Sequence, residues 1–212
     1  SYTFRSLVAG LGDRWRVLAP DHLGMGFSER TGRMHRLADR IDELDALTAT
    51  LEVEGPVLLV AHDWGGPIAL GWSQRHPDLV SGVVLLNTAV SQPDATRVPP
   101  LIATARSGRL LRTVTQRTRA FLDGTLRLAH PTLPKEVAAA YRAPYRSASR
   151  RQAIADFVAD IPLETAVTAD VGEAAVGVRA RAAAAAAREV LVMDADERPI
   201  GGNPFDGIAL VV

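Results

Sequence analysis

Residues Val57 to Gly66 read Val-Leu-Leu-Val-Ala-His-Asp-Trp-Gly-Gly, an apolar run that ends abruptly at a carboxylate between small residues. Ala61 lies two positions before Asp63, and Gly65 lies two positions after it. A sharp strand-to-helix turn needs small residues at these positions, because larger Cβ substituents would collide there. The stretch therefore predicts a buried strand, a tight turn that exposes Asp63, and a helix that follows.

Two interpretations of Asp63 are compatible with this pattern. Aspartate is a favoured helix N-cap, and residues 67–75 have the composition of a helix. The other interpretation is a catalytic nucleophile held on the turn. Trp64 and the pair Gly65-Gly66 favour the nucleophile, because a helix cap requires neither a large indole nor two residues without Cβ atoms.

The flanking segments predict strands that alternate with helices. Tyr2 to Leu11 has the pattern of a short amphipathic helix, and Arg14 to Ala19 that of a strand. Val80 to Leu86 is a continuous apolar run, typical of a parallel strand covered on both faces. Large aliphatic residues at helical spacing indicate a helix with one buried face: Leu37, Ile41, Leu44, Leu47 and Leu51. This alternation is the signature of an α/β fold.

The second half of the chain has a different composition. After Asn87 come several prolines and then Arg-rich helical segments that continue to about Phe157. We interpret residues 1–87 as the first part of a core and residues 88–164 as a helical lid, although a simple helical extension would have the same composition. Residues 165–212 form a divergent tail with a run of alanines at 182–187, and this sequence specifies its fold poorly.

Length, charge and cysteine content exclude several classes of protein. The 212 residues are enough for one substantial core. The net charge is zero and the basic residues are scattered along the sequence, which predicts no attraction to nucleic acid or to an acidic membrane surface. The absence of cysteine excludes disulfides, a thiolate nucleophile and Cys-based metal sites, and it fits a reducing cytoplasm. No apolar stretch is long enough to span a bilayer.

The segment His62-Asp63-Trp64-Gly65-Gly66 resembles the nucleophile elbow of α/β-hydrolases, and more narrowly the haloalkane dehalogenase and epoxide hydrolase branch, in which Asp replaces Ser. Pro20 to Ser28 is similar to the Pro-Asp-x-x-Gly-x-Gly-x-Ser loop of these hydrolases, and Leu85 to Ala89 to the strand end before their lid. Tyr141 to Tyr145 and Phe157 to Leu163 look like the end of the lid, especially that of the β-lactone decarboxylases of bacterial long-chain olefin biosynthesis. The resemblance implies an α/β-hydrolase fold, with a mostly parallel sheet flanked by helices and an inserted helical lid, incomplete at both ends.

The resemblance also implies a mechanism. Asp63 would attack carbon, displace a leaving group and form a covalent ester. The backbone N–H of Trp64 would contribute to an oxyanion hole and its indole N–H would donate to the leaving group, the alternative for this side chain being core packing. Tyr141 and Tyr145 would contact a small apolar or lipid-like substrate. The resemblance implies neither a cofactor nor a metal.

Other parts of this machinery are not visible in the sequence. The loop that supplies the second oxyanion donor in relatives would precede Ser1. All histidines lie within or before the expected lid, so none matches the late base of the family: His22, His35, His62, His76 and His130. Asn87 stands where some dehalogenases carry their acid, which leaves Asp194 or Asp196, after a possible strand starting at Glu189, as the candidate acid.

The beginning and the tail of the chain lead to two further expectations. The family strand that would precede Ser1 lies between the strands at Arg16 and Val57, so we expect two sheet edges facing an empty slot. The abrupt change in composition near Thr165 suggests a fragment whose tail is read out of frame or replaced.

Three functions remain as hypotheses. The first is a hydrolase-type enzyme in which Asp63 attacks a haloalkane, or a β-lactone that loses carbon dioxide. The second is an epoxide hydrolase, in which Tyr141 and Tyr145 protonate the epoxide oxygen. The third is a catalytically incomplete fragment or non-catalytic remnant that keeps the pocket without the base. A serine hydrolase is disfavoured because Asp occupies the elbow.

Overall fold

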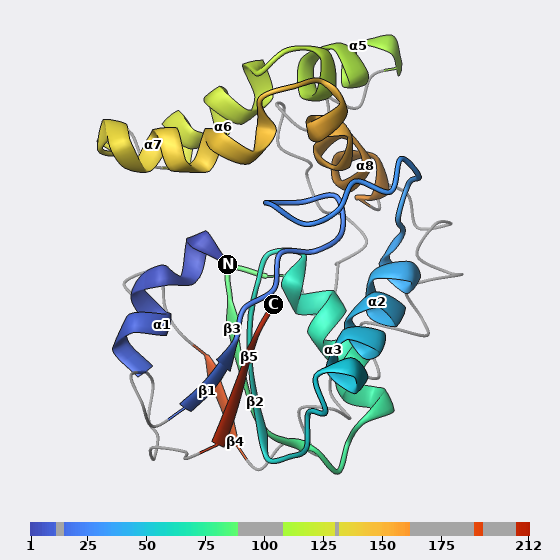
Figure 1. The fold of residues 1–212 in the computed structure, drawn as a ribbon, viewed down its shortest axis with the longest axis vertical. Coiled ribbons are helices and arrows are strands. Elements are labelled where there is room, and N and C mark those ends of the chain that lie inside the picture. Colours follow the sequence, from blue (N-terminus) through green and yellow to red (C-terminus); the bar gives the residue numbers. More distant parts are fainter. Residues whose placement is uncertain (12–14, 89–107, 130–131, 162–188, 193–206) are drawn as a thin grey trace. The chain divides into compact units, whose positions relative to one another are not determined.

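The computed structural model describes residues 1–11, 15–88, 108–129, 132–161, 189–192 and 207–212 (Figure 1). Its contacts divide the chain into two compact units. Unit 1 comprises Ser1–Pro20, Leu37–Ala95 and Glu164–Val212, and unit 2 comprises Asp21–Arg36 and Thr96–Leu163.

Unit 1 is built on a parallel sheet with strand order β1-β5-β2-β3-β4 (Figure 1). The strands expected near residues 14–19, 57–61 and 80–86 are confirmed, and so is the strand that begins at Glu189. Their bounds are Trp15–Leu18 for β1, Val57–His62 for β2, Val80–Leu86 for β3, Glu189–Val192 for β4 and Gly207–Val211 for β5.

The last strand, β5, lies between β1 and β2 and pairs in parallel with both, with Ala209 opposite Val17 and Leu58. The expected empty slot in the sheet is therefore wrong. The run Gly207 to Val212 is short but almost wholly aliphatic, which suits a central strand covered on both faces. Ala209, Leu210 and Val211 are at most 1% exposed, so this strand is part of the core.

Helices cover the two faces of the sheet with separate apolar clusters. Alternate residues of a strand point to opposite faces. Val57, Leu59 and Ala61 of β2 therefore face the helices α2 (Leu37–Thr50) and α3 (Gly65–Arg75). Leu58 and Val60 face the other side, toward η1 (Tyr2–Phe4) and α1 (Arg5–Leu11). The three predicted helical regions are confirmed, and together they leave β2 buried from both sides.

The contact between α2 and α3 includes polar side chains. The indole of Trp72 is fully buried, and its N–H donates to the Thr48 hydroxyl at 2.9 Å. At the rim, the His76 imidazole bonds with the Asp45 carboxylate, at 2.5 Å. The predicted buried face of α2 is confirmed for Leu37, Ile41 and Leu44, whereas Leu51 lies beyond the end of α2 and is 37% exposed.

Unit 2 combines the loop Asp21–Arg36 with short helical segments. The helical segments were predicted from the Arg-rich composition after Asn87, whereas the loop was expected in the core. Most of its buried apolar side chains come from the final helix. No helix in the described part of the chain has the length and hydropathy needed to cross a membrane. The segments are α5 (Gly108–Arg112), the π-helical turn η3 (Thr113–Arg117), α6 (Ala120–Ala129), α7 (Lys135–Arg142), η4 (Ala143–Tyr145), η5 (Ser149–Arg151) and α8 (Gln152–Asp160).

Arginine side chains hold the segments of unit 2 together. The Arg151 guanidinium, on a side chain that is 5% exposed, donates to the carbonyl oxygens of Gln116 at 2.8 Å, Arg117 at 3.0 Å and Tyr145 at 2.8 Å. Arg30 donates in the same way to Gly26 at 2.6 Å and to other carbonyls around it. One buried guanidinium thus satisfies carbonyls from separate segments.

The charges separate between the two units, although the sequence suggested that they are scattered. Unit 2 contains 15 of the 24 Lys and Arg residues and six of the 24 Asp and Glu residues, for a net charge of +9. Unit 1 contains the remaining nine basic and 18 acidic residues, for a net charge of −9. The expectation of scattered charge is therefore wrong. The basic residues look scattered along the sequence because segments of the two units alternate along the chain.

Candidate active site

The β2–α3 turn places Asp63 at the carboxyl end of β2. This strand ends at His62 and α3 begins at Gly65, so that only two residues connect them. Asp63 has a φ of +52°, in the left-handed region. This conformation costs roughly 1–2 kcal/mol for a residue with a Cβ atom. The predicted sharp strand-to-helix turn is confirmed.

Hydrogen bonds with β3, with Thr88 after it and with α3 hold this turn. The Asp63 N–H donates to the Leu86 carbonyl at 3.4 Å. The Asp63 carbonyl accepts from the Gly66 N–H at 3.1 Å and from the Thr88 hydroxyl at 2.6 Å. Thr88 was not recognised in the sequence. The available signal was Gly66, because a Cβ atom at this position would overlap the Thr88 hydroxyl.

Gly65 allows the backbone of the last strand to approach the turn. A Cβ atom on Gly65 would overlap the Val212 carbonyl oxygen, which also accepts the His62 N–H at 3.1 Å. Ala61, on the strand side of the turn, is fully buried. The small residues predicted around Asp63 are therefore required by close packing, and β5 provides one of the packing partners.

The Asp63 side chain reaches solvent, while surrounding protein atoms partly desolvate its carboxylate. Burial raises the pKa of Asp63 above the ordinary aspartate value, and the His62 imidazole and the Trp64 backbone N–H act in the opposite direction. The N-cap position of α3 is Trp64, and no side chain makes a capping hydrogen bond there. Asp63 is therefore not the N-cap residue of α3, and its role as a nucleophile stays a prediction.

Trp64 and Asn87 flank Asp63. The Trp64 indole is half-buried and packs against the apolar cluster below α3, which fits the core-packing alternative, while its backbone N–H bonds to the Asp63 carboxylate. Asn87 follows β3, has a φ of +41° and is exposed. Leu86 is in register with His62, so Asn87 and Asp63 each directly follow paired strand residues.

The two predicted lid tyrosines belong to unit 2. Tyr141 lies on α7 and is half-buried. The Tyr145 hydroxyl accepts the Gly26 N–H at 3.0 Å and donates to the Met25 sulfur at 3.9 Å. Burial raises the pKa of Tyr145, and the Gly26 N–H and the Arg30 guanidinium oppose that rise. Within unit 2, Tyr145 anchors the glycine-containing loop.

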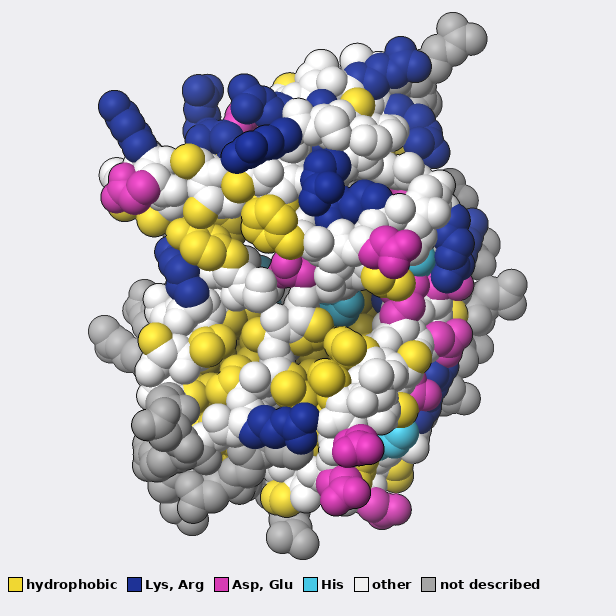
Figure 2. All heavy atoms as spheres, viewed as in Figure 1, with side chains coloured by type: hydrophobic (Ala, Val, Ile, Leu, Met, Phe, Trp, Pro, Cys, Tyr) yellow, Lys and Arg dark blue, Asp and Glu magenta, His cyan; other side chains and the backbone are white. Residues whose placement is uncertain are grey.

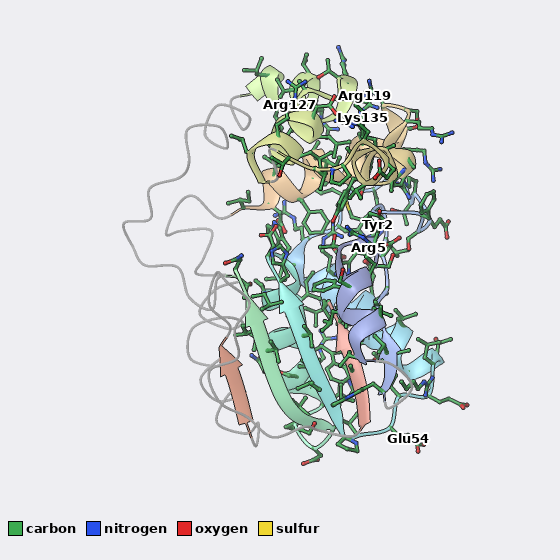
Figure 3. The ribbon with its side chains drawn as sticks, turned by 90° about the vertical axis from the view of Figure 1, so that its left-hand side faces the viewer. Tyr2, Arg5, Glu54, Arg119, Arg127 and Lys135 are labelled. Atoms are coloured by element: carbon green, nitrogen blue, oxygen red, sulfur yellow. The ribbon has the colours of Figure 1, made fainter. Side chains whose placement is uncertain are left out.

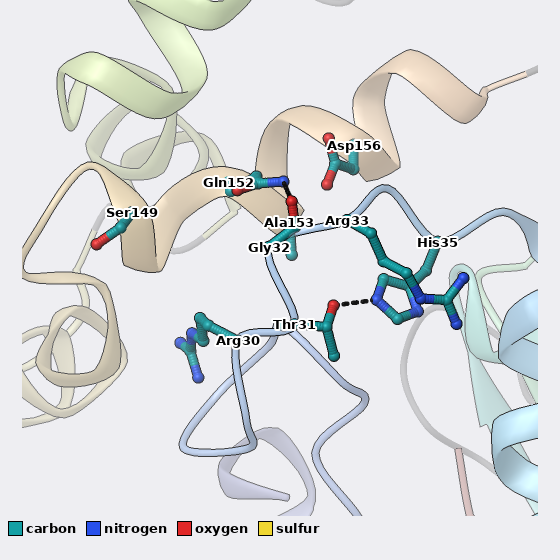
Figure 4. Close-up of a pocket in the computed structure, with 10 residues that line it drawn as sticks. Arg30, Thr31, Gly32, Arg33, His35, Ser149, Gln152, Ala153 and Asp156 are labelled. Carbon is teal, nitrogen blue, oxygen red and sulfur yellow. Dashed lines mark hydrogen bonds between the residues drawn. The ribbon is translucent and has the colours of Figure 1, made fainter.

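A small hollow in unit 2 lies between this loop and α8 (Figure 4). Two of its side chains, His35 and Asp156, are each 3% exposed. His35 bonds with the Thr31 hydroxyl, and the Gln152 amide donates to the Gly32 carbonyl at 3.1 Å (Figure 4). The second of these bonds fastens the loop to the beginning of α8.

The remaining predicted site residues, Asp194 and Asp196, lie outside the described residues and stay predictions. Among the described residues, no group of three or more His, Asp or Glu side chains has the arrangement needed to hold a metal ion.

Comparisons with known proteins agree with this geometry. A cis-3-alkyl-4-alkyloxetan-2-one decarboxylase from Xanthomonas campestris pv. campestris is 37% identical over 175 residues, which cover 78% of this chain and 58% of the relative. A haloalkane dehalogenase from Mycolicibacterium smegmatis is 30% identical over 190 residues, which cover 82% of this chain and 60% of the relative. The chain thus spans about three fifths of the length of these curated relatives.

The fold matches that of solved structures. The crystal structure of a point mutant of haloalkane dehalogenase DatA from Agrobacterium tumefaciens C58 has a TM-score of 0.78, with 20% identity, 99% of this chain covered and 76% of that chain. The family described as alpha/beta hydrolase fold matches residues 1–157. The protein therefore belongs to the alpha/beta hydrolase fold family.

Proposed function

We propose that Asp63 is a nucleophile that forms a covalent ester with an electrophilic carbon of an apolar, lipid-like substrate. The observation that carries this proposal is the left-handed backbone of Asp63 between β2 and α3. A residue with a Cβ atom adopts this strained conformation where the surrounding structure imposes it, and such residues cluster at functional sites. The raised pKa of its carboxyl adds support, because a more basic carboxylate is a better nucleophile.

The substrate class is a β-lactone, by analogy with the relative described as an oxetan-2-one decarboxylase. An Asp63 oxygen attacks the saturated ring carbon that is bonded to the ring oxygen. A new C–O ester bond forms, the ring C–O bond breaks, and its electron pair stays on the released carboxylate. Loss of carbon dioxide then forms the C=C bond and expels Asp63 as a carboxylate.

This sequence of steps needs no water and no proton transfer. It therefore regenerates Asp63 without a base. This matters because the histidines of this sequence end at His130, and none matches the late base that the resemblance implies. With a haloalkane, an Asp63 oxygen would form the ester while the carbon–halogen bond breaks and halide leaves with the electron pair. Release of that ester requires an activated water. The lactone reaction thus makes fewer demands on the residues that the chain carries.

Trp64 would assist by donating its indole N–H to the carboxylate oxygen released from the ring. The epoxide alternative receives less support, because the Tyr145 hydroxyl is already bonded to Gly26 and its raised pKa makes it a weaker acid.

The test is incubation with a cis-3,4-dialkyl-oxetan-2-one, with alkene measured by gas chromatography and carbon dioxide by trapping. The proposal predicts equal amounts of both products over many turnovers, and none from Asp63→Asn. The matched control is Asp78→Asn, which removes a carboxylate outside the turn and should leave the rate unchanged. Alkene formation by Asp63→Asn at the wild-type rate would overturn the proposal.

A further inference from the structure

The helices of unit 2 have a surface of almost one sign. Within residues 110–161, only Glu136 among the described acidic side chains is exposed. Asp123 bonds with Arg142 at 2.6 Å, Asp156 is buried, and Asp160 pairs with Arg36 at 3.8 Å. The exposed basic side chains are Arg112, Arg117, Arg119, Arg127, Lys135 and Arg146. The acidic residues thus do little to neutralise the exposed cations.

These cations gather on consecutive segments. Figure 2 shows Lys and Arg side chains concentrated over helices α5 to α7. Three of them, labelled in Figure 3, come from α6, the start of α7 and the residue preceding α6: Arg127, Lys135 and Arg119. None of these three takes part in an ion pair among the described residues. Several positive charges on neighbouring helices produce a field that attracts an anionic surface.

The helices that carry these cations also carry exposed aliphatic side chains. Leu128, directly after Arg127 on α6, is 73% exposed, and Leu110 on α5 is 42% exposed. Helices that lie in a membrane interface combine Lys and Arg on a polar face with exposed Leu, Phe or Trp. Binding of single-stranded nucleic acid instead relies on exposed aromatic rings for base stacking. The exposed large side chains on these helices are leucines, which favours lipid.

We propose that this helical surface, defined by Arg119, Arg127, Lys135 and Leu128, binds the surface of an anionic phospholipid membrane. The cations contact lipid headgroups, and Leu128 inserts at the boundary with the acyl chains. The net charge of +9 on unit 2 and of −9 on unit 1 makes the attraction specific to unit 2. This inference is independent of the chemistry at Asp63.

The experiment is flotation of the full chain with vesicles of phosphatidylcholine alone and of phosphatidylcholine mixed with phosphatidylglycerol. We expect binding to the mixed vesicles only, and its loss in high salt because surface charges are then screened. Each removed cation should weaken binding about fivefold, so Arg127→Gln with Lys135→Gln should lower it roughly 25-fold. Leu128→Gln should weaken binding while leaving the net charge unchanged.

The matched control is Arg5→Gln with Arg16→Gln, which removes two exposed cations from unit 1 and changes the net charge by the same amount. It should bind vesicles as well as the wild type. Equal loss in both double variants would overturn the proposal, because the effect would follow net charge alone. Absence of vesicle binding by the wild type would also overturn the proposal. The nucleic-acid alternative would be favoured if the wild type bound polyuridylic acid but not vesicles, and if Arg127→Gln with Lys135→Gln abolished that binding.

Discussion

Unit 1 is held by an aliphatic core, whereas unit 2 is held by guanidinium groups that donate to backbone carbonyls. In unit 1, both apolar clusters include alternate residues of β2, such as Leu59 and Val60, which are 0% and 4% exposed. In unit 2, one buried side chain, Arg151, joins carbonyls from η3 and η4. The difference predicts which substitutions destabilise each unit. Unit 1 should lose stability when a larger side chain disturbs its close packing, and unit 2 when one guanidinium donor is removed.

The largest effect should come from Gly65→Val in unit 1. The added side chain would collide with the Val212 carbonyl, so β5 would have to move away from the turn. Overpacking against backbone should cost about 3 kcal/mol or more of unfolding free energy. Urea unfolding followed by Trp fluorescence measures it. In the matched control, Gly124→Ala, the new Cβ atom meets no other atom within 4 Å, so this variant should be neutral or slightly more stable. A stable Gly65→Val with β5 still protected from hydrogen exchange would contradict the packing account.

A second large effect, confined to unit 2, should follow Arg151→Met. The substitution leaves three carbonyls, including that of Tyr145, without their donor, at a cost of about 3 kcal/mol. Hydrogen exchange should show faster amides in residues 113–158 and unchanged amides in β2. Arg146→Met, which removes an exposed guanidinium, should leave both regions unchanged. Equally faster hydrogen exchange in both units would contradict the prediction that Arg151 stabilises unit 2 alone.

An intermediate effect should come from Trp72→Phe, which removes a polar contact from the apolar unit. The variant loses the indole N–H bond to the Thr48 hydroxyl and some buried volume, for about 2 kcal/mol together. Combining it with Thr48→Val removes both partners, so the double variant should be less destabilised than the sum of the single ones. Strict additivity in urea unfolding would show that the hydrogen bond contributes little.

The smallest effect should be a pH-dependent gain of stability in Asp63→Asn. A raised folded-state pKa means that the folded protein retains its proton at a pH where the unfolded chain has lost it. Ionisation of Asp63 therefore lowers stability as the pH rises from the unfolded to the folded pKa. Asparagine does not ionise and tolerates a left-handed φ. The unfolding free energy of Asp63→Asn minus that of the wild type should therefore grow through this acidic window and then stay constant. Urea unfolding at several pH values measures this difference. A difference that is the same at every pH would contradict the prediction.

The β2–α3 turn was predictable because its signals are local. The apolar run before Asp63 and the small residues on either side of it specify strand, turn and helix within ten positions. Thr88 carried only the indirect signal of Gly66, since a hydroxyl that follows β3 acquires its role through a contact with a segment distant in sequence. Asn87 was singled out from the resemblance as the position of the acid in some dehalogenases, and the structure places it directly after Leu86, the partner of His62 in the sheet.

The position of β5 and the separation of charge could not be predicted, because both depend on long-range contacts. Gly207 to Val211 lies far along the chain from the strands that it joins, and a five-residue apolar run does not specify its neighbours. The charge of unit 2 becomes apparent only when Asp21–Arg36 is grouped with Thr96–Leu163. Contacts such as that of Gly26 with Tyr145 create this grouping.

The most direct test of the central claim is intact-mass analysis of the chain after incubation with a primary alkyl bromide, followed by peptide mapping. The account predicts one added alkyl group, located on Asp63, together with one equivalent of bromide. Asp63→Asn should give neither. An alkyl group on another residue, or an equal adduct on Asp63→Asn, would contradict the assignment of Asp63 as the nucleophile.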